Sequence, residues 1–344
     1  MNRKTAAVIC PGRGTYNREE LGYLGRHHGD KGEFLAAIDH YRLQHGQRPV
    51  RELDALPRYD SAVHNVGENV SAIIYACALA DFADIDPQRF EIVAVSGNSM
   101  GWYLALACAG VLDPAGAIDV VNTMGSMMRE EIIGGQLVYP LVDEEWRIVP
   151  ARREQLSTAL AAVNGQQGAE AHVSIDLGGM WVLGGNELGL RSLHEVLPNL
   201  DRYPMRLPNH AAFHTPLMDP VVSRARAALP VSLFNGPQLP LVDGFGRIWE
   251  PFATELEELY DYTLGAQINC PYSFSTAVEV LLKEFAPDVL IVPGPGSTLS
   301  VSIAQVLIQQ TWLGIDSRSA FLRRQGEDPI VLAMGIEAQR RLVV

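Results

Sequence analysis

The strongest pattern of apolar and polar positions lies at the end of the first third of the chain. Residues 92–95 have the length and composition of a buried strand, and residues 102–108 are apolar enough for a buried helix. Residues 97–101 between them read Gly-Asn-Ser-Met-Gly and must reverse the chain within a few positions. Glycines on both sides of the serine remove the Cβ atoms that would clash in so sharp a turn. A serine on a strand-to-helix turn of this kind is typical of a nucleophile elbow.

The rest of the chain alternates short apolar segments with longer helical ones. We expect strands at 5–10, 92–95, 136–141, 173–176, 180–183, 203–207, 239–242 and 289–292. We expect helices at 17–28, 33–45, 66–82, 102–108, 114–131, 152–163, 187–196, 252–262, 274–284 and 299–309. Strands joined by helices imply a parallel sheet covered on both faces.

Residues 135–207 have an order of their own: strand, helix, two strands, helix, strand. This β-α-β-β-α-β order is the signature of a ferredoxin-like unit. We therefore predict an α/β fold in which residues 1–134 and 208–344 form a large α/β-hydrolase-like domain with a parallel sheet core. A ferredoxin-like subdomain, residues 135–207, is inserted into it.

Composition narrows the class of protein. Of the 344 residues 47% are apolar, yet no run approaches the roughly 18 apolar residues of a membrane span. The first ten residues hold too short an apolar segment for a secretion signal, so we expect a cytoplasmic protein with no membrane partner. The cysteines at 10, 77, 108 and 270 form no CxxC pair, which indicates buried reduced thiols rather than zinc ligands or disulfides.

The formal net charge of −13 argues against nucleic acid as a partner. It would also repel an acidic protein unless basic side chains are gathered in one place. Such a group occurs near the C-terminus and consists of Arg318, Arg323, Arg324, Arg340 and Arg341. We interpret it as a solvated helix face, the commoner use of such a cluster.

The elbow predicts a chemistry for Ser99. Its hydroxyl would stand above the sheet, and the first backbone N–H groups of the following helix, starting with Met100, would face an oxyanion. The first predicted strand runs directly into Pro11-Gly12-Arg13-Gly14, whose glycines let backbone N–H groups approach a bound group closely. This loop is a candidate for the second half of an oxyanion hole.

A serine hydroxyl is a weak nucleophile and needs a base within hydrogen-bond reach. Five of the nine histidines lie in helical segments where a surface position is expected: His27, His28, His40, His45 and His194. The pattern does not exclude His64, His172 or His210. His214 differs because it lies in the turn Ala-Ala-Phe-His-Thr-Pro, where the chain re-enters the large domain and an imidazole can face a cleft.

Four segments carry a resemblance to a known family. In order they are PGRG at 11–14, GNSMGWYLALACAGVLD at 97–113, AAFHTPLMDP at 211–220 and VPGPGSTLS at 292–300. Together they resemble the malonyl-CoA:acyl-carrier-protein transacylases and the acyltransferase domains of polyketide synthases, over essentially the whole chain. The resemblance implies an acyltransferase of fatty-acid or polyketide biosynthesis with a Ser99–His214 dyad. Ser99 is acylated by an acyl thioester, and a carrier-protein phosphopantetheine thiol takes the acyl group.

The same resemblance implies the rest of the site. A backbone carbonyl, here that of Ser273, orients His214, and the backbone N–H groups of Met100 and Arg13 hold the oxyanion. The acyl pocket is formed by Asn98, Met124, Met180 and Phe213. The implied substrates are acyl-CoA or acyl-carrier-protein thioesters and the implied partner is an acyl carrier protein. No bound cofactor and no metal are expected, and we expect a monomer.

The sequence departs from the family at three positions. Arg13 replaces a glutamine, Asn98 replaces a histidine, and Met124 stands 25 residues after Ser99, where the malonyl-specific enzymes have an arginine that binds the malonyl carboxylate. A thioether cannot pair with a carboxylate, and burying that charge unpaired costs several kcal/mol. Arg129 lies about 140° further around the helix, so Arg13 is the one substitute we name. We therefore expect a neutral acyl group, long chains included, with Met180 as further flexible lining.

Two other functions remain open. A hydrolase on the same scaffold would let water deacylate Ser99, and a non-catalytic scaffold that binds carrier proteins would tolerate Asn98 and Met124. An intact Ser99 and His214 argue against the scaffold. An ordinary α/β-hydrolase esterase is disfavoured because its acid-then-histidine order and its HGGG-like loop are absent.

Overall fold

The computed structural model describes residues 3–130 and 133–344. Its first sheet has six strands in the order β11-β10-β1-β2-β7-β8. The strands are β11 (Val331–Ala333), β10 (Val289–Val292), β1 (Lys4–Cys10), β2 (Phe90–Gly97), β7 (Leu241–Val242) and β8 (Ile248–Trp249). All neighbours are parallel except β7 and β8, which form an antiparallel edge.

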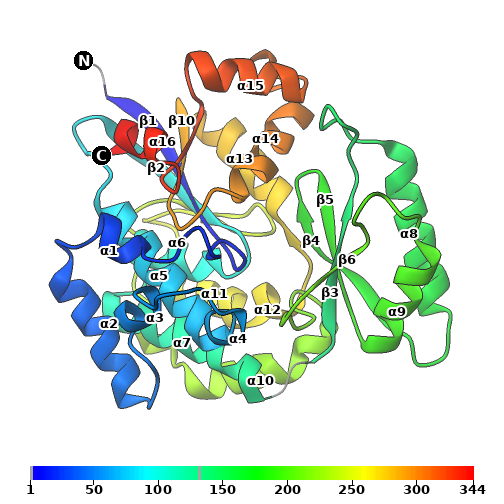
Figure 1. Cartoon of the computed structure of the whole chain (residues 1–344), viewed down its shortest axis with the longest axis horizontal. Helices are drawn as coiled ribbons and strands as arrows, with labels where there is room; N and C mark the ends of the chain where they lie inside the picture. Colours follow the sequence, from blue (N-terminus) through cyan, green and yellow to red (C-terminus); the bar gives the residue numbers. More distant parts are fainter. Residues whose placement is uncertain (1–2, 131–132) are drawn as a thin grey trace.

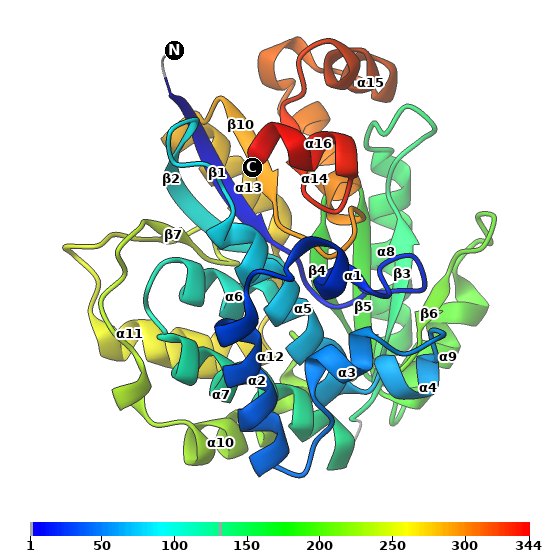
Figure 2. The same ribbon diagram turned by 60° about the vertical axis from the view of Figure 1, so that its left-hand side comes forward.

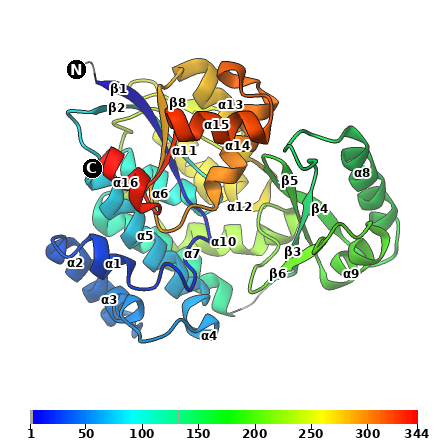
Figure 3. The same ribbon diagram turned by 45° about the horizontal axis from the view of Figure 1, so that its top comes forward.

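Alternate side chains of β1 explain the layers around this sheet. Ala6, Val8 and Cys10 belong to the core cluster shared with the helices α5 (Gly67–Ala83), α6 (Gly101–Cys108) and α7 (Pro114–Glu130). Ala7 and Ile9 point the other way, into the cluster shared with α13 (Phe274–Phe285) and α14 (Leu299–Gln309). A strand buried on both faces needs helices on both sides, and Figures 1 and 3 show α5 and α7 on one side and α13 and α14 on the other.

The second sheet has five strands in the order β6-β3-β5-β4-β9. They are β6 (Met205–Leu207), β3 (Gly135–Pro140), β5 (Met180–Gly185), β4 (Ala171–Leu177) and β9 (Tyr272–Ser273). One face is covered by α8 (Pro150–Asn164) and α9 (Glu187–Val196), with which it shares a core of its own. Val138, Ile175 and Val182 on the other face join the cluster of α13 and α14. The second sheet therefore packs directly on the large domain (Figures 1 and 2).

The remaining helices range from the three residues of α12 to the 13 residues of α2. They are α1 (Tyr23–His27), α2 (Gly32–Gln44), α3 (Val50–Asp54), α4 (Ser61–His64), α10 (Asp219–Ala228), α11 (Leu256–Asp261), α12 (Gln267–Asn269), α15 (Arg318–Glu327) and α16 (Glu337–Val343). Single turns of 3-10 helix occupy Pro216–Met218, Val231–Leu233 and Trp312–Gly314, and a π-helical turn occupies Tyr262–Ala266. Among the described residues no helix has both the length and the apolar character needed to cross a membrane.

The predicted α/β class is confirmed, with a parallel sheet covered on both faces and a second, smaller sheet. The boundaries of the inserted subdomain, 135–207, stay a prediction. One strand of that sheet, β9, comes from outside the range and pairs in parallel with β4. A two-residue strand leaves no periodic signal in the sequence, so the pattern could not reveal it.

Several predicted elements are shorter than expected. The helix at 17–28 begins only at Tyr23, because Gly22 has φ 84° and cannot continue a helix. The helix at 252–262 begins at Leu256 and runs on into the π-helical turn. The expected strands at 203–207 and 239–242 keep only Met205–Leu207 and Leu241–Val242. The last position of the helix expected at 114–131 lies outside the described residues.

Two expectations about polar residues were wrong. His28 and Arg340, both expected at the surface, are buried beside Asp81. Nε2 of His28 lies 2.8 Å and a guanidinium nitrogen of Arg340 lies 2.5 Å from the same carboxylate oxygen. The charged sequence neighbours of each residue favour a surface position, whereas its partner is more than 50 positions away. Cys10, Cys77 and Cys108 are buried as expected, and Cys270 is partly exposed.

Candidate active site

The serine stands on a strained turn between β2 and α6. Ser99 has φ 56°, a left-handed conformation that a residue with a side chain rarely adopts. A Cβ on Gly97 would lie 2.1 Å from the carbonyl oxygen of Gly101, and one on Gly101 would lie 2.3 Å from that of Cys10. Both glycines are therefore required for the turn to close, and the turn is a nucleophile elbow at the carboxyl end of β2.

His214 meets the serine from another part of the chain. Its Nε2 lies 2.8 Å from Ser99 Oγ, and its Nδ1 lies 2.7 Å from the carbonyl oxygen of Gln267. A carbonyl oxygen can only accept, so Nδ1 carries the hydrogen and Nε2 is left to accept a proton from the serine. This is the contact that the elbow and the Ala-Ala-Phe-His segment led us to expect.

The imidazole is held in its neutral form. His214 is only 1% exposed, and burial lowers its pKa to about 4, against the opposing effect of the hydrogen bond to the Gln267 carbonyl. The residue has φ 61°, and its backbone N–H donates to the carbonyl of Ile268 at 2.7 Å. At neutral pH the ring is therefore an uncharged acceptor with a fixed tautomer, which is what a general base needs.

The expected role of the Ser273 carbonyl was wrong, because Gln267 accepts the bond instead. Ser273 is the N-cap of α13 and is paired with Asp176 in the second sheet. The residue that reaches the imidazole begins α12, directly after the π-helical turn. A backbone carbonyl is common to every residue, so only the fold could identify this one.

Gln267 also holds the nucleophile through its side chain. Its Nε2 donates to the carbonyl of Ser99 at 3.0 Å, and its Oε1 accepts a hydrogen bond from the Tyr103 hydroxyl at 2.9 Å. One buried residue thus contacts both members of the Ser99–His214 pair. No motif in the sequence distinguishes Gln267 from the other glutamines.

The loop expected to complete the oxyanion hole lies against the elbow. The backbone N–H of Asn98 donates to the carbonyl of Cys10 at 3.0 Å, and a Cβ on Gly12 would lie 2.5 Å from the carbonyl oxygen of Asn98. Arg13 follows directly. Met100 and Arg13 both line the cavity beside Ser99.

A small cavity opens beside Ser99. Its volume is about 40 Å³, and it is lined by Arg13, Ser71, Ser99, Met100, Tyr103, Val121, Met124, Gly125, Phe213, His214 and Gln267. Met124 and Phe213 therefore line the cavity as expected. Val121, Met124 and Gly125 have the spacing of one helix face, the signal that identifies α7 as a wall. The side chain of Arg129 lies outside the described residues.

Two expected pocket residues do not line this cavity. Met180 lies on β5 opposite Pro140 and packs into the cluster beneath the second sheet. Asn98 precedes the serine on the elbow, and its side chain lies beside Gly12. Because the chain turns sharply here, the side chain of Ser99 faces the cavity and that of Asn98 does not.

The guanidinium of Arg13 is the cation of this cavity. It donates to the carbonyl of Asn209 at 3.1 Å, and burial lowers its pKa to about 10, so it stays charged at neutral pH. Burial and the nearby Arg13 lower the pKa of His210 to about 3. The bond from Arg13 to Asn209 joins the loop after β1 to the segment that leads to His214.

The other histidines left open by the pattern have structural partners. His210 Nδ1 lies 2.9 Å from Gln136 Oε1, and His172 Nε2 lies 2.9 Å from a carboxylate oxygen of Glu170. Both nitrogens of His64 lie within 3.0 Å of backbone carbonyls, those of Asp60 and Leu53. None of the three lines the cavity beside Ser99.

Within the described ranges one group of side chains has the spacing of metal ligands: His28, Asp81 and Asp84. Arg340 pairs with both carboxylates, and Lys31 Nζ lies 2.6 Å from Asp84. Burial acts to raise the pKa of Asp81, but its bonds with His28 and Arg340 hold it below the usual value. The carboxylates are already neutralised by fixed cations, so the group is a structural network.

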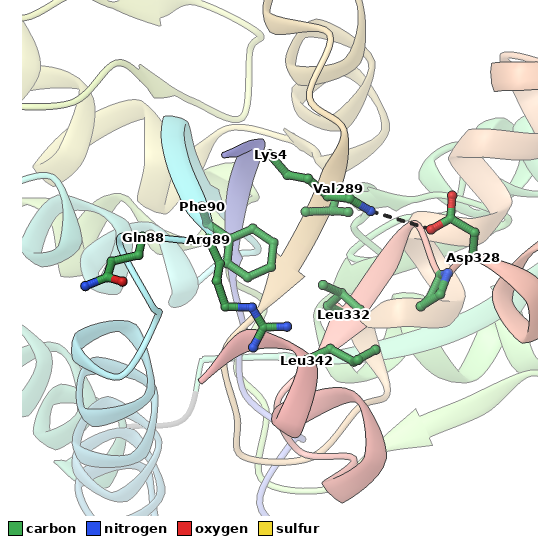
Figure 4. Close-up of a pocket in the computed structure, with 9 residues that line it drawn as sticks. Lys4, Gln88, Arg89, Phe90, Val289, Asp328, Leu332 and Leu342 are labelled. Atoms are coloured by element: carbon green, nitrogen blue, oxygen red, sulfur yellow. Dashed lines mark ion pairs between the residues drawn. The ribbon is translucent and has the colours of Figure 1, made fainter. Parts of the chain in front are cut away.

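A second hollow lies at the opposite end of the sheet, near the amino ends of β1 and β10 (Figure 4). It has a volume of about 300 Å³ and mostly apolar walls, among them Phe90, Val289, Leu332 and Leu342. Its charged rim includes the ion pair of Lys4 with Asp328, at 3.5 Å. No nucleophile with a base is among its lining residues, whereas the cavity at Ser99 has both.

No family model matches the chain. It is 26% identical over 247 residues to a phenolphthiocerol/phthiocerol polyketide synthase of Mycobacterium tuberculosis, covering 68% of this chain and 15% of that protein. It is 25% identical over 226 residues to the non-reducing polyketide synthase CTB1 of Cercospora nicotianae, covering 65% and 10%. The chain thus spans 15% or less of the length of these curated relatives.

Solved structures match over nearly the whole chain. The malonyl-CoA:acyl carrier protein transacylase FabD of Xanthomonas oryzae pv. oryzae superposes with a TM-score of 0.73 at 19% identity, covering 99% of this chain and 98% of that one. A type II polyketide malonyl-transacylase, solved in complex with its acyl-carrier protein, gives 0.72 at 20% identity, covering 88% and 93%. The family resemblance predicted from the sequence is confirmed, and the fold is that of the malonyl-CoA:acyl carrier protein transacylases.

Proposed function

We propose that this chain is an acyltransferase that moves an acyl group from a thioester of CoA or of a carrier protein to the phosphopantetheine thiol of an acyl carrier protein. The reaction would pass through an acyl-enzyme on Ser99 and serve fatty-acid or polyketide biosynthesis. The observation that carries the proposal is the 2.8 Å contact between Ser99 Oγ and Nε2 of a buried, neutral His214, on a strained elbow. The fold shared with malonyl-CoA:acyl carrier protein transacylases supports it.

In the first half-reaction, Ser99 Oγ attacks the thioester carbonyl carbon while His214 Nε2 takes the hydroxyl proton. The C–S bond then breaks, and the imidazolium returns its proton to the leaving sulfur. In the second half-reaction the carrier thiol gives its proton to His214, its sulfur attacks the ester carbon, and the proton returns to Ser99 as the C–O bond breaks. In both, the Gln267 carbonyl accepts the Nδ1 hydrogen, and the amides of Met100 and Arg13 stabilise the oxyanion.

The cavity limits the acyl group. A volume of about 40 Å³ is small for a ligand site, since sites for small molecules usually measure roughly 300 Å³ or more. We therefore propose a short acyl group, which narrows the range of chain lengths expected from the sequence. Met124 lines this cavity and offers no partner to a carboxylate, which favours a neutral group. Arg13 lines the cavity as well, and its positive charge would favour an acyl group with a carboxylate.

We propose that the protein needs no bound cofactor and acts as a cytoplasmic monomer. Its macromolecular partner is then the acyl carrier protein. The alternative function is hydrolysis of the same acyl-enzyme. Transfer and hydrolysis differ only in the second nucleophile, which is the carrier thiol in one and water in the other.

The experiment is intact-mass spectrometry of the protein after exposure to a panel of short acyl-CoA thioesters, with Ser99→Ala as control. We expect a single acyl adduct on the wild type and none on the variant. The hydroxyl points out of the core, so the variant should keep its fold. An adduct of equal yield on Ser99→Ala would exclude Ser99 as the nucleophile.

A further inference from the structure

A buried hydroxyl in the wall of the cavity beside Ser99 has no partner in the protein. Among the described residues six polar side chains line this cavity, and five of them are hydrogen-bonded to other protein groups: Arg13, Ser99, Tyr103, His214 and Gln267. The sixth is that of Ser71 on α5, which is only 2% exposed. Its hydroxyl forms no hydrogen bond with any part of the chain that the structure describes.

Ser71 lies where α5 and α7 pack closely together. A Cβ on Gly125 of α7 would lie 2.8 Å from the carbonyl oxygen of Gly67, and Ser71 follows Gly67 by one turn on the same helix face. A helical serine often donates to the carbonyl four residues earlier, as Ser157 does to Arg153 at 3.0 Å. Ser71 makes no such bond, so both its donor and its acceptor capacity remain for a bound group.

The opposite wall of the cavity offers this hydroxyl nothing. Val121, Met124 and Gly125 bring no polar side chain to it. An acyl group that fills so small a space excludes water, so the Ser71 hydroxyl then bonds either to the acyl group or to nothing. A plain alkyl chain leaves it buried and unpaired, which is unfavourable, whereas an acyl group with an oxygen at the right carbon satisfies it.

We propose that Ser71 is a specificity-determining residue that hydrogen-bonds to an uncharged oxygen on the acyl group, an inference that rests on the proposed function. The substrate class is a short acyl thioester with a hydroxyl or keto group near C3. Ser71 and Ser99 line the same cavity of about 40 Å³, so an oxygen that meets Ser71 lies close to the ester carbon on Ser99. A serine hydroxyl donates to a ketone and either donates to or accepts from a hydroxyl, so it serves both groups.

The test compares thioesters that differ at one position. 3-Hydroxybutyryl-CoA, in both enantiomers, and acetoacetyl-CoA carry an oxygen at C3, and 3-methylbutyryl-CoA carries a methyl group in its place. We measure kcat/KM for acylation of Ser99 by these and by malonyl-CoA in the wild type, Ser71→Ala and Ser157→Ala. Ser157 is the control, because it is an exposed helical serine on α8 that does not line the cavity. Urea denaturation of the same proteins reports their stability.

We expect the wild type to prefer an oxygen-bearing thioester to 3-methylbutyryl-CoA about five- to ten-fold, the value of one uncharged hydrogen bond. Ser71→Ala should slow the oxygen-bearing substrates and abolish this preference, and Ser157→Ala should keep it. Since the Ser71 hydroxyl has no partner in the described chain and alanine is the better helix former, Ser71→Ala should unfold at no lower urea concentration than the wild type.

Three results would overturn the inference while leaving the acyl-enzyme in place. The first is a wild type with no preference, or the same preference in Ser71→Ala. The second is a lower urea midpoint for Ser71→Ala, which would give the hydroxyl a structural role. The third is a loss of rate in Ser71→Ala with malonyl-CoA alone, which would assign the hydroxyl to a carboxylate. If none of the thioesters acylates Ser99 in the wild type, the proposed function itself fails, and the inference fails with it.

Discussion

The residue that governs the chemistry at neutral pH is His214. Burial, opposed by the bond to Gln267, lowers its pKa from 6.5 to about 4. Below that pH the ring is protonated and cannot take the Ser99 proton, so kcat/KM for acylation should fall as pH drops through about 4 and stay level between 5 and 7. The measurement is a pH–rate profile of acylation, with circular dichroism at each pH to confirm that the protein stays folded. An inflection near 6.5 would contradict the account of a buried base.

Met124 and Arg13 determine which acyl group the cavity prefers, and they favour different substrates. Met124 offers no ion pair, whereas Arg13 brings a cation to the same cavity. A buried ion pair is worth roughly 3 to 5 kcal/mol, or about two to four decades in rate. We expect a short neutral acyl-CoA to acylate Ser99 faster than malonyl-CoA, Met124→Arg to gain malonyl activity, and Arg13→Gln to lose little. These are measured as kcat/KM for both thioesters. A wild-type preference for malonyl-CoA that Arg13→Gln removes would assign the carboxylate to Arg13.

Among the structural elements, the elbow could be predicted from the sequence. Gly-Asn-Ser-Met-Gly between a buried strand and a buried helix predicts its own geometry, because only glycine fits where the carbonyls of Gly101 and Cys10 crowd the turn. The partner of His214 could not be predicted in this way. It depends on a π-helical turn that brings one carbonyl, out of many equivalent ones, to the imidazole.

The glycines of the elbow give a stability prediction. Gly97→Ala places a Cβ 2.1 Å from the Gly101 carbonyl oxygen, which forces the backbone to move. We expect it to lower the free energy of unfolding by more than about 3 kcal/mol, measured by urea denaturation. Gly236→Ala is the matched control, since a Cβ there meets no atom within 4 Å. Equal stabilities of the two variants would show that the turn is not under steric constraint.

At the scale of the whole molecule, helix α16 is fixed to the first half of the chain by charge. Arg340 pairs with Asp81 and Asp84 at the end of α5, and Gly294 after β10 donates to Asp81. Arg340→Met would leave these carboxylates with less compensation, and we expect a loss of roughly 3 to 5 kcal/mol in the free energy of unfolding. Arg341→Met, which removes an exposed pair with Glu337, should change it by about 0.5 kcal/mol or less. Similar losses in urea titrations of both variants would refute the buried network.

The sequence predicted the layers of the molecule but not its long-range polar contacts. Hydrophobic periodicity identified β10, α9 and α14 to the residue, since each is a continuous apolar or amphipathic segment. It misplaced His28 and Arg340, because a buried charge is recognised only by a partner that the fold brings near. For Met180 the pattern predicted the strand, but it did not predict which way the side chain faces.

In the proposed reaction Ser99 carries an acyl group that a carrier thiol then takes over. The most direct test isolates the acyl-enzyme, mixes it with holo acyl carrier protein, and follows both species by quenched-flow mass spectrometry. We predict that the adduct on Ser99 disappears as acyl carrier protein gains the same mass, many-fold faster than it is lost to water alone. Loss of the adduct at the same rate with and without the carrier, with free acid as the product, would instead make this protein a hydrolase.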